Sequence, residues 1–210
     1  MAKKILIAVG AVFVLLIIVI ATRPAEFAIE RKTTINAPAD VVFNQVNDFH
    51  QWKNWSPWEK LDPSQKLTFT GAETGTGAKY AWAGSDKVGE GNMEITHSTP
   101  PELVEIALNF TKPFEAHNIT RFVFTSDSPT ATTVTWVMAG NRGFLEKAMS
   151  LVMDMDKMVG PDFEKGLASM KEAAEADATK RAAEKAAADA AAAAAAPADA
   201  DGGTADAGTK

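Results

Sequence analysis

The chain has 210 residues, 46% of them hydrophobic, and its formal net charge at pH 7 is −6. This acidic balance argues against a nucleic-acid-binding protein, because nucleic acids require a concentrated basic surface. There is no cysteine, and the three histidines, His50, His97 and His117, are too far apart in sequence for a local zinc motif. We therefore expect no disulfide, no metal site and no cofactor.

The hydrophobic residues are unevenly distributed, and the sequence divides into three parts. Residues 5–21 are an uninterrupted apolar run, and residues 172–210 contain 20 alanines in 39 positions. Residues 23–171, between them, have an ordinary globular composition with 15 basic and 19 acidic side chains. This division predicts an N-terminal transmembrane anchor (1–22), one globular domain (23–171) and an alanine-rich tail (172–210) that is first helical and then disordered.

The apolar run is long enough for a short membrane span, about 25 Å as a helix. Lys3 and Lys4 precede it, and the positive-inside rule places them in the cytoplasm. The domain would then be extracytoplasmic, or periplasmic in a Gram-negative bacterium. A cleaved signal peptide is the alternative, but its apolar core is normally about 7–15 residues, and Val19 and Ala21 make a poor cleavage site. We favour an uncleaved anchor.

The globular part begins with a strand and short helices. Residues 26–35 alternate in polarity, which predicts a strand, and Pro38 then marks the start of a helix with apolar residues three or four apart. Trp52, Trp55 and Trp58 follow in a segment that Pro57 prevents from forming one long helix. These tryptophans either pack the short helices onto the sheet or form a lip at the membrane interface, and we favour packing for Trp52 and Trp55.

Six further strands are predicted by alternating runs that are separated by turn residues. Each run has one apolar and one mixed face, which is typical of an antiparallel sheet covered on one side. The expected strands are residues 66–73, 75–85, 91–101, 103–110, 117–127 and 131–140.

Residues 144–171 carry apolar side chains three or four apart, which predicts the helix that covers the sheet. We expect Gly160-Pro161 to kink or divide this helix, because proline lacks an N–H and clashes with the preceding turn. Residues 172–196 are rich in strong helix formers, but alanine buries little surface, so we expect a solvated helix without a core to join. Pro197 should end it, and a disordered segment should follow.

The order of elements and several motifs resemble the SRPBCC superfamily, which includes START-type, birch-pollen-allergen-like and polyketide cyclase/dehydrase proteins. The resemblance covers residues 27–171. The motifs are INAPADVVFNQVNDFHQWKNWSPW, GTGAKYAW, Pro113-Phe114 and MDKMVGPDFEKGLASMK. The resemblance implies an α+β helix-grip fold, in which a curved antiparallel sheet of six or seven strands wraps around a long C-terminal helix and leaves a cavity between them.

Two side chains are weak candidates for acid–base catalysis. Tyr80 is the only tyrosine, and strand alternation directs it to the inner face, where Met93, Ile95 and His97 are also expected. An acid–base group must lie within hydrogen-bond reach of the substrate. No pattern in the sequence brings these groups together, and a core tyrosine and a hydrogen-bonded histidine are the simpler interpretations. We therefore assign no catalytic residue.

The stronger signal is the apolar inner face, which either fills a core or, as the resemblance implies, lines a ligand cavity. Methionines on the facing helix suit an adaptable apolar site. The expected lining is Tyr80, Trp82, Met93, Ile95, Ile106, Leu108, Phe110, Phe122, Phe124, Trp136 and Met138 from the sheet, with Met149, Val152 and Met155 from the helix.

Our leading hypothesis is a membrane-anchored module that binds a hydrophobic small molecule or lipid without catalysing a reaction. The first alternative is a cyclase- or dehydratase-like enzyme that acts on a hydrophobic substrate through Tyr80 or His97. The second is a structural or interaction protein of the cell envelope whose tail or tryptophans contact a partner.

Overall fold

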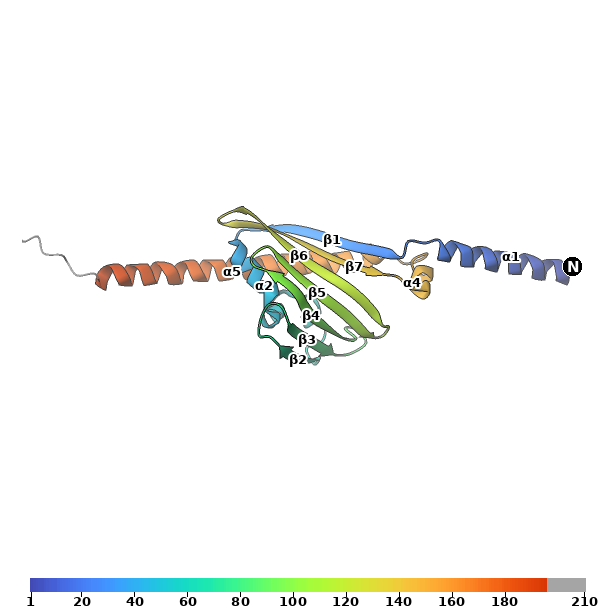
Figure 1. The fold of residues 1–210 in the computed structure, drawn as a ribbon, viewed down its shortest axis with the longest axis horizontal. Coiled ribbons are helices and arrows are strands. Elements are labelled where there is room, and N and C mark those ends of the chain that lie inside the picture. The colour runs from blue at the N-terminus through green and yellow to red at the C-terminus, as the bar shows by residue number, and fades with distance from the viewer. Residues whose placement is uncertain (196–210) are drawn as a thin grey trace, which may run out of the picture.

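A computed structural model describes residues 1–195. Seven antiparallel strands form one curved sheet around part of a long helix, in the order β1-β7-β6-β5-β4-β3-β2 (Figure 1). The α+β helix-grip fold expected from the sequence is confirmed. The strands are β1 Glu26–Ile35, β2 Lys66–Gly71, β3 Ala78–Ala83, β4 Glu90–Thr99, β5 Leu103–Lys112, β6 Ala116–Ser128 and β7 Ala131–Asn141.

Within residues 1–195, five helices and two 3₁₀ turns accompany the sheet. α1 is the one helix in the described residues that is long and apolar enough to cross a membrane, with a mean hydropathy of 3.0. It leaves the domain at one end, and the C-terminal half of α5 leaves at the other (Figure 1). The helices are α1 Ala2–Ala21, α2 Ala39–Asn47, α3 Trp52–Trp55, α4 Phe144–Met149 and α5 Met155–Ala195, with turns η1 Phe49–Gln51 and η2 Trp58–Lys60.

The expected division of the C-terminal helix at Gly160-Pro161 is wrong. α5 continues through both residues, and the break lies earlier, between α4 and α5. Gly160 has no side chain where the Arg31 guanidinium approaches the helix. Arg31 bonds to Asp156 at 2.8 Å and to Glu164 at 2.7 Å, one on each side of the proline. These ion pairs bridge the turn in which Pro161 lacks an N–H.

The first turns of the expected tail are also part of the domain, although the sequence predicts a helix with no core to join. Ala174 is fully buried. Glu175 accepts hydrogen bonds from the backbone and side-chain nitrogens of Asn36, each at 2.9 Å, and the backbone bond holds the pKa of Glu175 below its usual range. The disordered segment expected after Pro197 lies outside the described residues.

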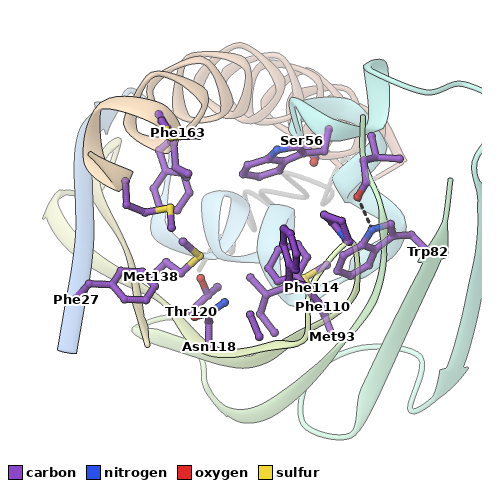
Figure 2. A pocket seen from close by; sticks show the side chains of 18 of the residues that line it. Phe27, Ser56, Trp82, Met93, Phe110, Phe114, Asn118, Thr120, Met138 and Phe163 are labelled. Carbon is purple, nitrogen blue, oxygen red and sulfur yellow. Dashed lines mark hydrogen bonds between the residues drawn. The ribbon is translucent and has the colours of Figure 1, made fainter. Parts of the chain in front are cut away.

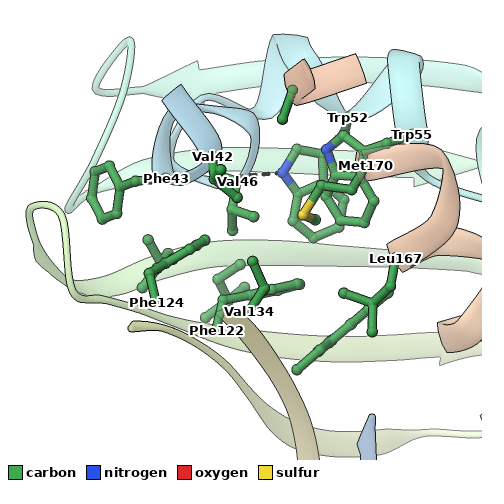
Figure 3. Packing of buried hydrophobic residues seen from close by; sticks show 14 of the residues in the cluster. Val42, Phe43, Val46, Trp52, Trp55, Phe122, Phe124, Val134, Leu167 and Met170 are labelled. Carbon is green, nitrogen blue, oxygen red and sulfur yellow. Dashed lines mark hydrogen bonds between the residues drawn. The ribbon is translucent and has the colours of Figure 1, made fainter. Parts of the chain in front are cut away.

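The packed core fills the half of the sheet's inner face that lies away from α1. α2, α3 and α5 supply side chains such as Val42, Trp55 and Leu167, which meet Phe122 and Phe124 from β6 (Figure 3). The two buried tryptophans of α3 also donate hydrogen bonds to α2. Trp52 Nε1 donates to the Val46 carbonyl at 3.1 Å, and Trp55 Nε1 donates to the Gln45 carbonyl at 2.7 Å. The packing interpretation of these tryptophans is therefore confirmed.

Trp55→Ala should lower the free energy of unfolding by about 3–5 kcal/mol, because it leaves a cavity at a fully buried position. Val123→Ala, on the outer face of β6 and 40% exposed, is the control and should change it by less than about 0.5 kcal/mol. Urea unfolding of the full chain in detergent measures both. Equal effects of the two substitutions would contradict the assignment of the core.

Candidate functional site

An apolar cavity of about 400 Å³ lies in the other half of the domain, between the sheet and the α4–α5 segment (Figure 2). It exists because α2 and α3 cover only the far half of the inner face. Its wall includes Phe27, Phe114 and Arg142 at the end of the sheet where β1 begins and β7 ends, and the exposed lining residues Phe114 and Met149 place the opening at this end. Most of its wall is aromatic or aliphatic, which is typical of small-molecule sites.

Nine of the fourteen residues expected to line a ligand cavity lie in its wall. They are Tyr80, Trp82, Met93, Leu108, Phe110, Trp136, Met138, Met149 and Met155. They come from β3, β4, β5, β7, α4 and the start of α5, so the fold brings together residues that are distant in sequence.

The other five expected residues lie elsewhere. Ile95, Ile106, Phe122 and Phe124 do face inward, but they belong to the packed core under α2 and α3. Phe124, for example, packs edge-on against Phe43 with ring centroids 5.5 Å apart. Val152 lies in the turn between α4 and α5 rather than on a covering helix, and it is 87% exposed.

A polar group on the cavity floor escaped the sequence analysis. Asn118 and Thr120, from β6, point into the cavity between Met138 and Phe114 (Figure 2). Both residues are buried. Within residues 1–195, Thr120 Oγ1 has no hydrogen-bond partner. The available signal was strand alternation, which places Asn118 on the same face as Thr120 and Phe122.

The Asn118 side chain occupies space that a glycine leaves open. Asn118 pairs with Gly140 of β7 across the sheet. A Cβ atom at Gly140 would collide with Asn118 Oδ1. No other described residue hydrogen-bonds to the Asn118 side chain, so its amide offers both donor and acceptor capacity to the cavity.

Tyr80 lies in the cavity wall and bonds to a carboxylate. Its hydroxyl donates to Glu59 Oε1 of η2 at 2.5 Å. Burial raises the pKa of Tyr80 far above its ordinary value, and the bond to Glu59 raises it further. Tyr80 is therefore a protonated hydrogen-bond donor across the physiological pH range.

His97 lies outside the cavity, contrary to its expected inward orientation. A β-bulge between Ile95 and His97 shifts the register, so that Ile95 pairs with Ile106 and His97 pairs with Glu105. Such a bulge interrupts the alternation of faces. His97 is exposed, and its Nε2 bonds to Thr99 Oγ1 at 2.9 Å. The two candidate acid–base residues are therefore not brought together.

These features define a helix-grip domain with an apolar cavity between the sheet and the α4–α5 segment. The chain belongs to the polyketide cyclase/dehydrase and lipid transport family, whose model matches residues 26–175. This membership confirms the resemblance to the SRPBCC superfamily. No curated protein matches the chain.

Solved structures share the fold at low sequence identity. An aromatase/cyclase, Zhui, from Streptomyces sp. R1128 is 14% identical, with a TM-score of 0.53 over 71% of this chain and 94% of its own. A protein of unknown function from Staphylococcus aureus is 12% identical, with a TM-score of 0.53 over 72% and 95%. A protein from Chromobacterium violaceum is 13% identical, with a TM-score of 0.52 over 70% of this chain and 96% of its own. At these identities the similarity shows the fold alone.

Asp62 holds the loop beside the cavity in place. It accepts bonds from Ser64 Oγ at 2.6 Å, from the Ser64 backbone N–H at 3.0 Å and from the Ser85 backbone N–H at 2.7 Å. These bonds hold the pKa of Asp62 well below its usual range. The carboxylate thereby ties the segment before β2 to the turn between β3 and β4, next to Val88 of the cavity wall.

Asp62→Ala should lower the Tm at pH 7, and the difference from the wild type should shrink as the pH falls below about 4. A depressed pKa in the folded state means that the stabilisation is present above the unfolded-state value, 3.8, and is lost as acid protonates the carboxylate. Thermal unfolding of both proteins in detergent from pH 7 to pH 2 measures this. A difference in Tm that does not change with pH would contradict the assigned role of the charge.

Proposed function

We propose that the domain binds a hydrophobic small molecule or lipid in this cavity without catalysing a reaction, and that α1 anchors it to a membrane with the domain on the extracytoplasmic side. The observation that carries the proposal is an apolar cavity of about 400 Å³ with a small polar floor. Its volume falls within the usual range for sites that hold one small ligand, roughly 300–1,000 Å³.

The wall supports binding of apolar surface from molecules that differ in shape. Burying such surface contributes about 25 cal/mol per Å². Met93, Met138, Met149 and Met155 supply flexible thioether side chains on opposite sides of the cavity. Because methionine changes rotamer readily, the cavity adapts to related ligands. This favours a class of hydrophobic ligands over a single one.

The floor supports binding of one polar group within that apolar ligand. Thr120 Oγ1 is buried without a partner in the described residues, a state that costs about 1–3 kcal/mol. A ligand carbonyl or hydroxyl near Asn118 and Thr120 would satisfy these groups. The ligand class is therefore an amphiphile that carries a hydrogen-bonding oxygen on a largely hydrocarbon body.

The enzymatic alternative has less support from the geometry. The family description and the aromatase/cyclase with the same fold favour it. Of the two candidate acid–base residues, however, only Tyr80 reaches the cavity. The high pKa of Tyr80 and its bond to Glu59 suit a fixed hydrogen-bond donor better than a group that exchanges protons.

Leu108→Trp should weaken binding of the fluorescent fatty acid cis-parinaric acid at least about tenfold, because the added ring fills the cavity. The matched control is Ile119→Trp, on the outer face of β6 and 44% exposed, which should bind like the wild type. A fluorescence titration of the full chain in detergent measures both, and circular dichroism checks the fold. Equal affinities for the two variants would exclude the cavity as the site.

Asn118→Leu should lower the affinity for hexadecanol about threefold to tenfold, as expected from the loss of one hydrogen bond. The affinity for hexadecane should stay the same or rise, because leucine has a similar size and no polar group. Displacement of cis-parinaric acid measures both ligands. A parallel loss for alcohol and hydrocarbon would mean that the substitution perturbs packing rather than polar recognition.

A further inference from the structure

Exposed apolar side chains concentrate at the mouth of the cavity. Within residues 22–195, seven of the eleven exposed large hydrophobic side chains lie there, and we call them the portal patch: Phe114, Phe144, Leu145, Met149, Val152, Met153 and Met158. A contiguous exposed apolar patch marks an interaction surface. Phe114, Met149, Met153 and Met158 also line the cavity, so the patch and the cavity wall are continuous.

The portal patch adjoins the end of the apolar helix α1. α4 contacts α1, and Ile20 is the one residue of α1 that is buried. Residues 22–25 join α1 to β1, and four residues reach at most about 14 Å. The Arg142 backbone N–H at the end of β7 also donates to the Ala25 carbonyl at 2.7 Å. α4 is therefore held beside the end of α1 (Figure 1).

We infer that the portal patch docks on the lipid bilayer that α1 enters, and that the cavity exchanges its ligand directly with the leaflet of that bilayer that faces the domain. The inference rests on the proposed binding function and on the anchoring of α1. It identifies the ligand as a membrane-resident lipid amphiphile rather than a solute taken from water. A lipid that passes over the portal patch moves from the hydrocarbon core of the bilayer to the apolar wall of the cavity. Its acyl chain is not exposed to water on the way.

The charges around the portal patch favour insertion of apolar side chains into the bilayer over electrostatic attraction to lipid headgroups. Three basic residues, Arg23, Arg142 and Lys147, lie at this end of the described chain, and they alternate in sequence with the acidic residues Glu26 and Glu146, so they do not form a basic cluster. Recruitment by anionic lipids requires clusters of basic residues. We therefore expect docking to the same extent on zwitterionic and anionic bilayers.

The absence of cysteine allows a direct test of docking. Val152→Cys, labelled with an environment-sensitive dye, is placed in the full chain in phosphatidylcholine nanodiscs. Nitroxides on the lipid acyl chains should quench the dye at least about twofold, and aqueous iodide should quench it weakly. The matched control is Val123→Cys on the outer face of the sheet, where iodide should quench and the nitroxides should not.

Equal behaviour of the two labelled positions would overturn docking. Self-quenching of the Val152 label that depends on protein density, without quenching by lipid nitroxides, would instead assign the patch to a second copy of the chain. Adding phosphatidylglycerol should leave the quenching unchanged. Docking that appears only with the anionic lipid would contradict the apolar mechanism.

The exchange step is tested with Leu145→Glu/Val152→Glu. These side chains belong to the portal patch but do not line the cavity. Transfer of cis-parinaric acid from vesicles to the nanodisc-bound protein should slow at least about tenfold. Energy transfer from the tryptophans of the cavity wall to the probe measures this rate. The affinity in detergent should not change. Ile119→Glu/Val123→Glu, on the outer face, is the control and should transfer at the wild-type rate.

Two outcomes separate this inference from the proposed function. A wild type that fails to bind the probe in detergent would refute the binding function itself. A wild type that binds in detergent, with a double variant that transfers at the normal rate, would leave the binding function intact and overturn the portal.

Discussion

The stacking of Trp136 on Phe163 is the contact on which the interior depends. The two rings are nearly parallel, 9° apart, with centroids separated by 3.9 Å, and they join β7 to α5. Trp55 and Trp58 meet Trp136 edge-on from the short helical segment. Gly166 lets α5 approach this cluster, since a Cβ there would lie 3.0 Å from the Trp136 ring. One aromatic group thus connects the sheet, α5 and the short helices.

This cluster also divides the interior into two parts with different properties. On the side away from α1, the helices α2 and α3 supply enough side chains to fill the inner face of the sheet. On the other side, the cover consists of α4, the first turns of α5 and the segment around η2 with Trp58 and Glu59, and a cavity is left. Protein interiors are otherwise packed as densely as organic crystals. The cavity is therefore a consequence of where the short helices end along the sheet.

The strands, their inward faces and nine residues of the cavity wall follow from patterns of two and of three to four residues, whereas the architecture was implied by the family resemblance. Those patterns give the direction of a side chain but not its position along the sheet, so they do not separate Leu108 of the cavity from Ile106 of the core. The single-residue β-bulge before His97 turns its side chain to the outer face, because side chains alternate between faces only in a strand without bulges. The helix continues through Pro161 because Arg31 of β1 pairs with Asp156 and Glu164. These partners are 125 or more residues away in sequence, so local sequence signals do not predict the pairs. Asn118 is polar, so an apolar pattern does not mark it as part of the cavity wall.

Because α5 is one continuous helix, it is much longer than the domain core that it covers. Its first turn lines the cavity mouth, and its 41 residues correspond to about 60 Å of straight helix. α1 and α5 leave the domain in opposite directions (Figure 1). If α1 crosses a bilayer as proposed, α5 acts as a stalk that carries Ala195 up to roughly 60 Å from the membrane surface. In that orientation, the helix that closes the binding site also holds the end of the described chain away from the membrane.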